Sequence, residues 1–393
     1  MNIKTERISL IDGLRGFSLF GILLANLLIF QYGIYGKDEI AFFDLPKWDL
    51  AGYHVTKILV ETSFMPIFAF LFGYALILMM TKLQQRQLPV KRYFFRRFLA
   101  LVVFGLLHTF FLWEGDILFT YGLMGIVLLL FLKRKAKTIF IWMVITFAIL
   151  FLLSFGGEDL GNDILYSEDT IQEYLKETFT IYQNGSYTEI MNHRFHEDPM
   201  ELGDIEIFVV LLLAPVTILP LFLLGMYAAH KGWLVDFQNK RKNYAMTAII
   251  LIPIGILAKL SPAFTSFVDF SLIGGSILAI GYIFLFAYLY SKFHDHRVMR
   301  AFEKVGKLSL SNYILQTMIC TTVFYGYGLG LFAKMGIWLG ILFGLSVYTI
   351  QVVASHWYMK RFKQGPLERV MRMFVYWNVR SKPKIEVKDV VNG

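Results

Sequence analysis

Residues 107–121 read LHTFFLWEGDILFTY, in which a tight WEGD turn at 113–116 joins two apolar segments. A histidine, His108, lies inside the first segment, and two carboxylates, Glu114 and Asp116, stand in the turn. Ionisable groups are costly at membrane depth, so those found there are candidates for function. The stretch therefore predicts a membrane-embedded helical hairpin with chemically active groups near its turn.

The two segments belong to a series of apolar runs that covers most of the chain. Of the 393 residues, 56% are hydrophobic and 17% are charged, with a mean hydropathy of +0.56, which excludes an ordinary soluble protein. Seven charge-free runs have about 20 residues or more, the length of one bilayer crossing: Gly16–Gly36, Thr62–Thr81, Thr138–Gly157, Ile207–Ala229, Phe270–Ser291, Leu308–Ala333 and Met335–Ser355. Three shorter runs have 16 residues each: Phe98–Trp113, Ile117–Leu132 and Asn243–Ala258. We expect an all-α polytopic membrane protein with about ten transmembrane helices, surrounded by a lipid bilayer.

The charged residues between the apolar runs are separated by sign. Basic clusters stand at 82–97, 133–137, 231–242 and beyond 360, whereas residues 155–206 include thirteen acidic residues and two basic ones, Lys176 and Arg194. By the positive-inside rule, the basic clusters face the cytoplasm. Both termini are therefore expected in the cytoplasm and the acidic segment outside it. The net charge of +9 then reflects topology and lipid-headgroup contact, and no nucleic-acid partner is expected.

These patterns divide the chain into four predicted parts. They are an N-terminal bundle of five helices (1–155), the acidic extracytoplasmic segment (156–206), a C-terminal bundle of five helices (207–358) and a basic cytoplasmic tail (359–393). Cys320 is the only cysteine, which excludes an intrachain disulfide and a cysteine-based metal site. His193 and His196 stand beside acidic residues but match no specific metal signature, so a solvated acidic lid is expected and no metal.

Two interpretations of the hairpin turn remain open. Each arm of 16 residues spans about 24 Å, short of a bilayer core of about 30 Å, so the turn can lie in a protein-lined recess. Asp116 is a good N-cap for the second helix, and capping and function account for it equally well. Capping does not account for His108, which we expect about a turn and a half deeper in the first helix.

Polar residues in other apolar runs form two further candidate groups. Asp12 and Arg15 are three positions apart and can pair on one helix face, and Asn26 follows eleven residues later. Arg15 alone is equally well an interfacial anchor, but a buried Asn26 needs a partner in another helix or a ligand. Asn312 and Gln316 are four apart and form a stripe suited to interhelical hydrogen bonds or to a cavity wall.

Five motifs that occur in order resemble the YeiB-like family of bacterial inner-membrane proteins. They are RISLIDGLRGF…GILLAN (7–26), FAFLFG (68–73), LH…LWEGDIL…YGLMG (107–125), GKLSLSNYILQTMICTTVFY (306–325) and FKQGPLE (362–368). The resemblance covers nearly the whole chain and implies a multi-pass protein of the bacterial cell membrane. Because this is a domain-of-unknown-function family, the resemblance implies no particular activity.

The DGLRG…N pattern of the first helix is also similar to the first helix of membrane acyltransferases. Those enzymes move an acyl group from a cytoplasmic thioester donor to an acceptor on the far side of the membrane. In the acyltransferase-3 type, a histidine stands eleven residues after the motif arginine, whereas this chain has Asn26 there. Because asparagine cannot act as a base, the base must be another residue.

Membrane acyl transfer is the first function that these observations favour. His108 would be the general base for an extracytoplasmic acceptor, oriented by Glu114 or Asp116. Arg15 and Asn26 would hold an acyl-CoA donor, and no other cofactor is implied. The candidate substrate-binding set is completed by Asp12, Asn312 and Gln316.

The alternative is a small-solute transporter, coupled to protons through His108 and Asp116. The absence of a convincing internal repeat in the sequence argues against it. A structural or signalling protein with the acidic segment as its sensor is a third class, which no sequence feature supports.

Overall fold

The computed structural model describes residues 9–155, 168–200, 204–265 and 267–377, with only the backbone course for 204–216. Residues 156–167 of the acidic segment and the tail beyond 377 lie outside the described residues. Within the described residues the chain is helical, with no strand beyond an isolated bridge between Phe155 and Val268. The predicted all-α class is confirmed.

The helices follow one another through short connections. In chain order they are α1 (Ser9–Tyr32), η1 (Ile40–Phe43), α2 (Lys47–Leu59), α3 (Phe64–Gln85), α4 (Val90–Phe111), α5 (Leu118–Leu128), α6 (Ala136–Leu153), α8 (Glu168–Asn184), α9 (Tyr187–His196), α10 (Asp204–Lys231), α11 (Arg241–Lys259), η2 (Ser261–Ala263), α12 (Ser271–Phe293), α13 (Arg297–Lys307), α14 (Ser309–Phe324), α15 (Ile337–Arg361) and α16 (Pro366–Tyr376). Pro366 starts α16, where its missing N–H costs nothing because the first turn has no carbonyl to receive that N–H.

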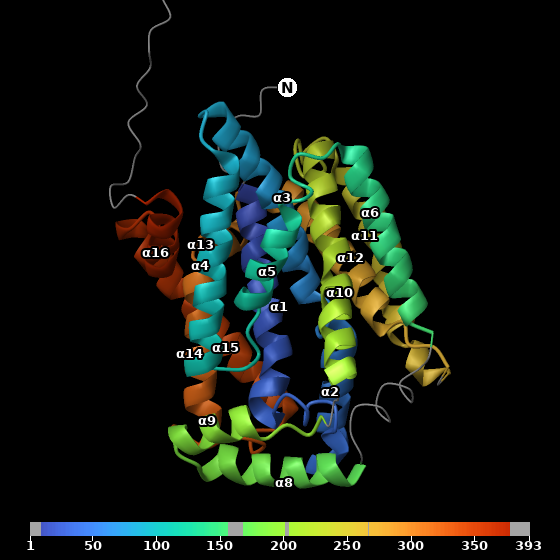
Figure 1. Ribbon diagram of the computed structural model, residues 1–393, viewed down its shortest axis with the longest axis vertical. Coiled ribbons are helices and arrows are strands. Elements are labelled where there is room, and N and C mark those ends of the chain that lie inside the picture. Colours follow the sequence, from blue (N-terminus) through green and yellow to red (C-terminus); the bar gives the residue numbers. More distant parts are fainter. Residues whose placement is uncertain (1–8, 156–167, 201–203, 266, 378–393) are drawn as a thin grey trace, which may run out of the picture.

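The long helices form a bundle whose two ends differ. Figure 1 shows α8 and α9 lying across one end, while the start of α1, the turn between α3 and α4, and α16 lie at the opposite end. We call these the α8–α9 end and the α16 end. Helix α1 is central. It packs against α3, α13, α14 and α15, and 67% of the residues in its most apolar stretch of 18 residues are buried.

Each of the ten predicted apolar runs falls on a helix of this bundle: α1, α3, α4, α5, α6, α10, α11, α12, α14 and α15. Among the described residues, seven helical stretches are long and apolar enough to span a membrane: Ser9–Tyr32, Lys47–Gln85, Val90–Phe111, Ala136–Leu153, Arg241–Lys259, Ser271–Phe293 and Ile337–Arg361. Helices α14 and α5 are shorter, with 16 and 11 residues. The helical content and these seven stretches identify a helical membrane protein.

The hairpin arms differ in length from the prediction of two equal arms. Helix α4 has 22 residues because it begins at Val90 and continues through the basic residues, of which Lys91 and Arg92 are exposed. Helix α5 has only 11 residues and ends at Leu128. Helix α4 ends at Phe111, and His108 lies in its last turn, five residues before Trp113 of the hairpin turn. Charge-free runs locate such helices but do not fix their ends.

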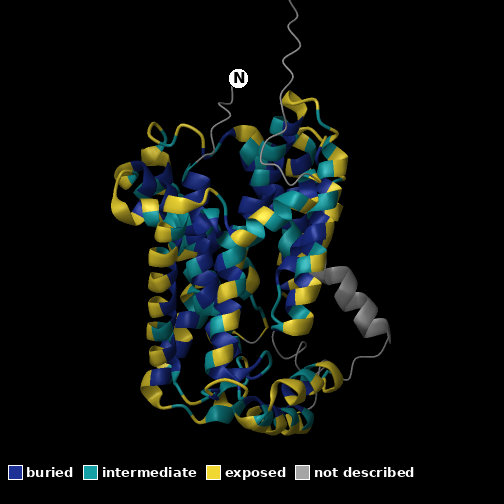
Figure 2. Ribbon diagram, turned by 90° about the vertical axis from the view of Figure 1, so that its left-hand side faces the viewer, coloured by how far each residue is buried: buried dark blue, intermediate teal, exposed yellow. Residues whose placement is uncertain are grey.

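The outer faces of the bundle expose large apolar side chains. One stripe on α4 recurs at helical spacing and consists of Phe95, Leu99, Val103, Leu106 and Phe110. Figure 2 shows buried residues concentrated inside the bundle and exposed ones along its outer faces and at its ends. Continuous apolar surface of this kind is unfavourable in water and is typical of contact with lipid. The stripe therefore faces the lipid bilayer.

Candidate functional site

His108 and Asp116 face each other across the turn between α4 and α5. The Nδ1 atom of His108 lies 2.9 Å from Oδ1 of Asp116, and both side chains are 1% exposed. The contact is close but bent, and among the described residues neither atom has a straight hydrogen bond. A carboxylate at this distance favours the tautomer with a proton on Nδ1.

The other ring nitrogen of His108 contacts helix α14. Its Nε2 atom lies 3.0 Å from Oγ1 of Thr317, a residue that is 1% exposed. With the proton on Nδ1, Nε2 is the acceptor for the threonine hydroxyl. Asp116, His108 and Thr317 thus form a carboxylate–imidazole–hydroxyl chain. In this arrangement a histidine can take the proton of a hydroxyl group.

Asp116 also caps helix α5. Its Oδ2 atom accepts a hydrogen bond from the backbone N–H of Phe119 at 2.7 Å, which satisfies one of the free donors of the first turn. From the sequence alone, helix capping and a functional role were equally good explanations for Asp116. The structure gives one oxygen to the cap and the other to the histidine.

Gly105 allows α4 and α5 to approach closely enough for this contact. A Cβ atom at this position would lie 2.2 Å from the backbone nitrogen of Phe119 and 2.7 Å from Oδ2 of Asp116. Any side chain here would therefore displace the start of α5. Gly105 lies three residues before His108, on the same helix face. The glycine thus brings the carboxylate to the histidine.

Two aromatic rings enclose the pair. The ring centroid of Tyr313 lies 5.2 Å from that of His108, and the ring centroid of Trp113 lies 6.4 Å from it. The Tyr313 hydroxyl accepts the N–H of Ile117 at 3.4 Å and donates to the carbonyl of Gly115 at 3.5 Å. Both distances are beyond the usual range for hydrogen bonds, so these bonds are weak. They hold the Tyr313 side chain loosely against the turn.

Glu114 binds the helices at the α8–α9 end instead of the histidine. Its Oε2 atom lies 2.7 Å from Nε of Arg194 in α9, and its Oε1 atom accepts from the Tyr182 hydroxyl of α8 at 3.2 Å. Arg194 also donates to the carbonyl oxygens of Thr109, at 2.6 Å, and Leu112, at 3.4 Å. A cation at a helix C-terminus satisfies free carbonyls and complements the helix dipole. Arg194 therefore holds α9 against the hairpin turn.

Helices α8 and α9 pack together around His193. Its Nε2 atom lies 2.7 Å from Oγ1 of Thr178, and its ring stacks on Tyr174 with centroids 5.1 Å apart. Burial lowers the pKa of His193 below its ordinary value of 6.5, an effect that Glu177 and Glu197 partly offset. Among the described residues, no group of three His, Cys, Asp or Glu is placed to hold a metal ion. His193 is a packing residue of this helix pair.

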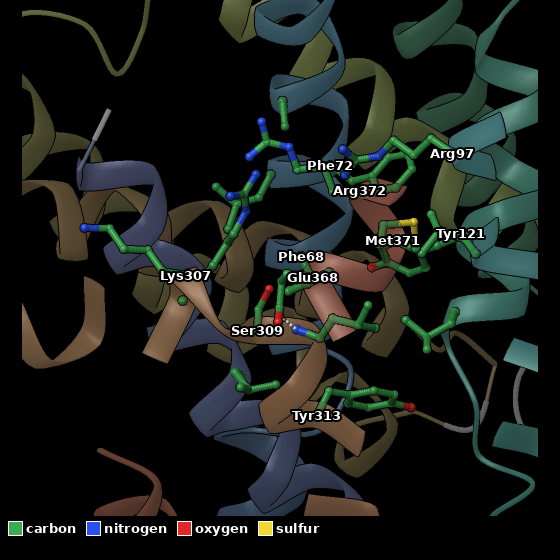
Figure 3. Close-up of a pocket in the computed structure, with 18 of the residues that line it drawn as sticks. Phe68, Phe72, Arg97, Tyr121, Lys307, Ser309, Tyr313, Glu368, Met371 and Arg372 are labelled. Atoms are coloured by element: carbon green, nitrogen blue, oxygen red, sulfur yellow. Dashed lines mark hydrogen bonds between the residues drawn. The ribbon is translucent and has the colours of Figure 1, made fainter. Parts of the chain in front are cut away.

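A cavity of about 320 Å³ lies between α1, α3, α4, α5, α14 and α16, a volume within the range of small-molecule sites. Four cationic residues line it: Arg15, Arg97, Lys307 and Arg372. Most of the remaining wall is apolar and includes Leu19, Ile22, Phe68, Leu71, Phe72, Leu101, Ile117, Leu118 and Met371. In Figure 3, Arg97 and Arg372 lie toward one end of the cavity and Tyr313 toward the other. The cavity is therefore cationic at one end and apolar toward the hairpin turn.

Glu368 of α16, whose carboxylate belongs to the cavity wall, forms hydrogen bonds with α14. Its Oε1 atom accepts the backbone N–H groups of Leu310, at 2.8 Å, and Ser311, at 3.1 Å, and its Oε2 atom accepts the Ser311 hydroxyl at 2.6 Å. These bonds cap the first turn of α14 and engage both oxygens. Because Glu368 is engaged in this way, the cavity keeps an excess of positive charge.

The residues predicted near the N-terminus do not join the hairpin pair. Arg15 lines the cavity, and its Nη1 atom lies 3.2 Å from Oδ1 of Asp12, the pairing that their spacing predicts. Asn26 is buried in α1 but does not belong to the cavity wall. Of the four residues Arg15, Asn26, His108 and Asp116, Arg15 alone belongs to the wall of this cavity as the described residues form it.

Asn312 and Gln316 bind the neighbouring helix α15. The Nδ2 atom of Asn312 donates to Oγ of Ser355 at 3.1 Å, and Nε2 of Gln316 donates to Oε1 of Gln351 at 2.8 Å. Gln351 donates in turn to the carbonyl of Asn312 at 2.9 Å. Of the two predicted roles for this stripe, the structure shows the interhelical hydrogen bonds.

Three residues of the site were not predicted from the sequence: Thr317, Arg97 and Arg194. Arg194 could have been noticed as one of two cations among thirteen acids, and Arg97 as the last charge before an apolar run. Thr317 has no such signal, because a threonine in an apolar helix can bond to its own helix backbone. Its role depends on a contact across 209 residues of sequence.

Comparison with known proteins agrees with the five sequence motifs. Residues 228–378 match the family described as "Protein of unknown function (DUF418)". The chain is 32% identical over 401 residues to the uncharacterized protein YxaH of Bacillus subtilis (strain 168), covering 98% of each chain. It is 26% identical over 398 residues to the uncharacterized protein YeiB of Escherichia coli (strain K12), covering 93% of this chain and 96% of that one. The chain thus belongs to the YeiB-like, DUF418 family.

Proposed function

We propose that the protein transfers an acyl group from a donor that binds in the cavity, with His108 as general base and Asp116 as the residue that positions it. The donor is an anionic amphiphile, an acyl group on a phosphate-bearing thioester such as acyl-CoA. The observation that carries this proposal is the cavity itself, cationic at one end and apolar toward the His108–Asp116 pair.

The cationic end of the cavity suits phosphate groups. Arg97 has no ion pair with a carboxylate among the described residues. Instead, it donates to Sδ of Met79 at 3.7 Å, and its guanidinium lies 5.8 Å from the ring centroid of Phe72. A guanidinium in such surroundings gains much from a bidentate phosphate contact. Arg15, Lys307 and Arg372 add positive charge around it. The donor's phosphates would therefore bind here.

The apolar part of the cavity leads toward the base. Its wall includes Ile117, which directly follows Asp116, and Tyr313, whose ring centroid lies 5.2 Å from that of His108. An acyl group that fills this part reaches the wall behind which His108 lies. The cavity thus offers one end suited to phosphate groups of the donor and another suited to its acyl group.

The direction of transfer follows from an inferred orientation in the bacterial plasma membrane. The basic residues of the α3–α4 turn, α13 and α16 stand at the α16 end, whereas acidic residues dominate α8 and α9. The positive-inside rule places the α16 end in the cytoplasm. The donor then enters from the cytoplasm, and the acceptor approaches from the α8–α9 end.

The test uses inverted membrane vesicles supplied on the outside with labelled acetyl-CoA or octanoyl-CoA. Release of CoA and incorporation of label into vesicle material are measured together. We expect His108→Ala to lower both rates about 10²- to 10⁴-fold, the usual contribution of a general base. His54→Ala, which changes an exposed histidine of α2, is the control and should leave them unchanged. Equal rates in His108→Ala and wild type would contradict the assignment.

A small-solute transporter remains the competing function, and the same protein distinguishes the two. Proteoliposomes are supplied with candidate solutes on the outside in the absence of any acyl donor. Uptake that disappears in Asp116→Asn, without CoA release in the vesicle assay, would replace acyl transfer by proton-coupled transport. CoA release without uptake supports the enzyme.

A further inference from the structure

We infer that Thr317 is the nucleophile of the transfer and carries the acyl group as an ester between donor and acceptor. This inference rests on the proposed function and specifies its covalent step. The geometry that carries it is the chain from Asp116 through His108 to Thr317, with contacts of 2.9 Å and 3.0 Å.

The surroundings of His108 identify Thr317 as the hydroxyl group within its reach before any substrate binds. Asp116 contacts Nδ1, Thr317 contacts Nε2, and the residue is 2% exposed. The proton that this imidazole is placed to accept is therefore the hydroxyl proton of Thr317. A threonine hydroxyl is a weak nucleophile until an adjacent base removes this proton, and a carboxylate behind the base stabilises the imidazolium that results.

Tyr313 separates Thr317 from the cavity. It lies one turn earlier on the same face of α14, and its ring forms part of the cavity wall. Because its hydroxyl makes only weak bonds to Ile117 and Gly115, rotation of the buried Tyr313 ring away from the wall breaks no strong hydrogen bond. That rotation joins the cavity to Thr317 and frees the N–H of Ile117 at the start of α5. A free N–H at a helix N-terminus can stabilise the oxyanion of an acyl transfer.

The covalent step occurs in two balanced halves. In the first, Oγ1 of Thr317 bonds to the thioester carbonyl carbon, the carbon–sulfur bond breaks, and His108 passes the threonine proton to the departing thiolate. In the second, a hydroxyl or amine of the acceptor bonds to the same carbon and the ester bond to Thr317 breaks. His108 moves the acceptor's proton to Oγ1, which restores the hydroxyl group.

Full-length protein in detergent, mixed with octanoyl-CoA in the absence of an acceptor, tests the inference. Mass spectrometry of the peptides that contain residue 317 detects the mass of one acyl group. We expect the ester on Thr317 in wild type and in Thr317→Ser, and a loss of about 10³-fold in the rate of CoA release in Thr317→Val. Thr321→Val, one turn further on the same helix face and equally buried, is the matched control and should behave as wild type.

One additional variant, Cys320→Ala, makes the outcome decisive. Cys320→Ala removes the buried thiol three residues away, so an adduct that persists in it is not a thioester on that cysteine. Thr317→Val with undiminished CoA release, or wild type with release and no ester, would overturn the inference and leave acyl transfer from donor to acceptor intact. If the wild-type protein releases CoA neither from acetyl-CoA nor from octanoyl-CoA, the proposed function is wrong, and the covalent step on Thr317 is wrong with it.

Discussion

Oδ1 of Asp116 lies 2.9 Å from Nδ1 of His108, so the residue that caps α5 also positions the histidine in the last turn of α4. The position of the imidazole is therefore tied to the backbone of the following helix. This connection distinguishes a carboxylate that only caps a helix from one that also sets the orientation of a base, and the two roles can be separated by substitution.

Replacing Asp116 by asparagine should remove the charge and keep the cap. Asparagine caps helices about as well as aspartate, so the thermal unfolding midpoint in detergent should stay close to that of wild type. Because the amide cannot stabilise an imidazolium, CoA release should fall about 10²-fold or more. Asp116→Ala should additionally lower the free energy of unfolding by about 1 kcal/mol. Wild-type activity in Asp116→Asn would show that the carboxylate serves the helix alone.

Replacing Gly105 by alanine should separate α4 from α5. The added Cβ would lie 2.2 Å from the nitrogen of Phe119, and overpacking of this kind costs about 1–3 kcal/mol. We expect a lower unfolding midpoint and a reduced rate of CoA release, because Asp116 moves away from His108. Leu106→Ala, at a 39% exposed neighbour on α4, is the control and should change neither quantity much.

Replacing Arg194 by glutamine should loosen α9 from the hairpin turn. The change removes the ion pair with Glu114 and two hydrogen bonds to carbonyls at the end of α4, which are then left without this partner. A local cost of about 1–3 kcal/mol is expected. Hydrogen exchange in α8 and α9 should become faster, whereas Lys176→Gln, at the exposed second cation of this region, should leave it unchanged.

The α8–α9 pair should loosen as pH falls. Because burial lowers the pKa of folded His193 below 6.5, the opened state binds the proton more tightly. The stability of the pair should be constant above pH 6.5 and should decrease below it, down to the lowered pKa. Hydrogen exchange of both helices between pH 7.5 and 5 measures this. His193→Gln, which can keep a hydrogen bond to Thr178, should have a flatter pH profile.

The glutamine pair between α14 and α15 should behave as a unit. Gln316→Leu leaves a buried amide oxygen of Gln351 without its partner, at a cost of about 1–3 kcal/mol in unfolding free energy. Adding Gln351→Leu removes that oxygen, so the double variant should be less destabilised than the sum of the single ones. An additive result in thermal unfolding would mean that the two side chains do not interact.

The helices of this protein were largely predictable because an apolar run of bilayer length has few other structures available. The ends of these helices were not predictable. The first arm of the hairpin, for example, continues through Lys91 and Arg92, because exposed charged residues permit a helix that a hydropathy pattern does not detect. A charge-free run therefore locates a helix, whereas the caps and connections decide where that helix begins and ends.

The candidate site was predictable where burial makes a residue costly. His108 and Asp116 stand out in an apolar sequence for this reason, and their closeness in sequence made a contact plausible. Thr317 and Arg194 approach them from segments far along the chain, at separations of 209 and 85 residues for the contacts with His108 and Thr109. Such pairings depend on how the helices pack, which no local pattern specifies.

Glu368 connects the wall of the cavity to helix α14, because this α16 residue also holds the first turn of α14. A displacement of α16 breaks these bonds and uncaps the helix that carries Tyr313 and Thr317. The α16 side of the cavity and the helix beside the hairpin turn are therefore mechanically coupled. A deletion from residue 366 onward would accordingly disturb the hairpin region, although it removes no residue from it.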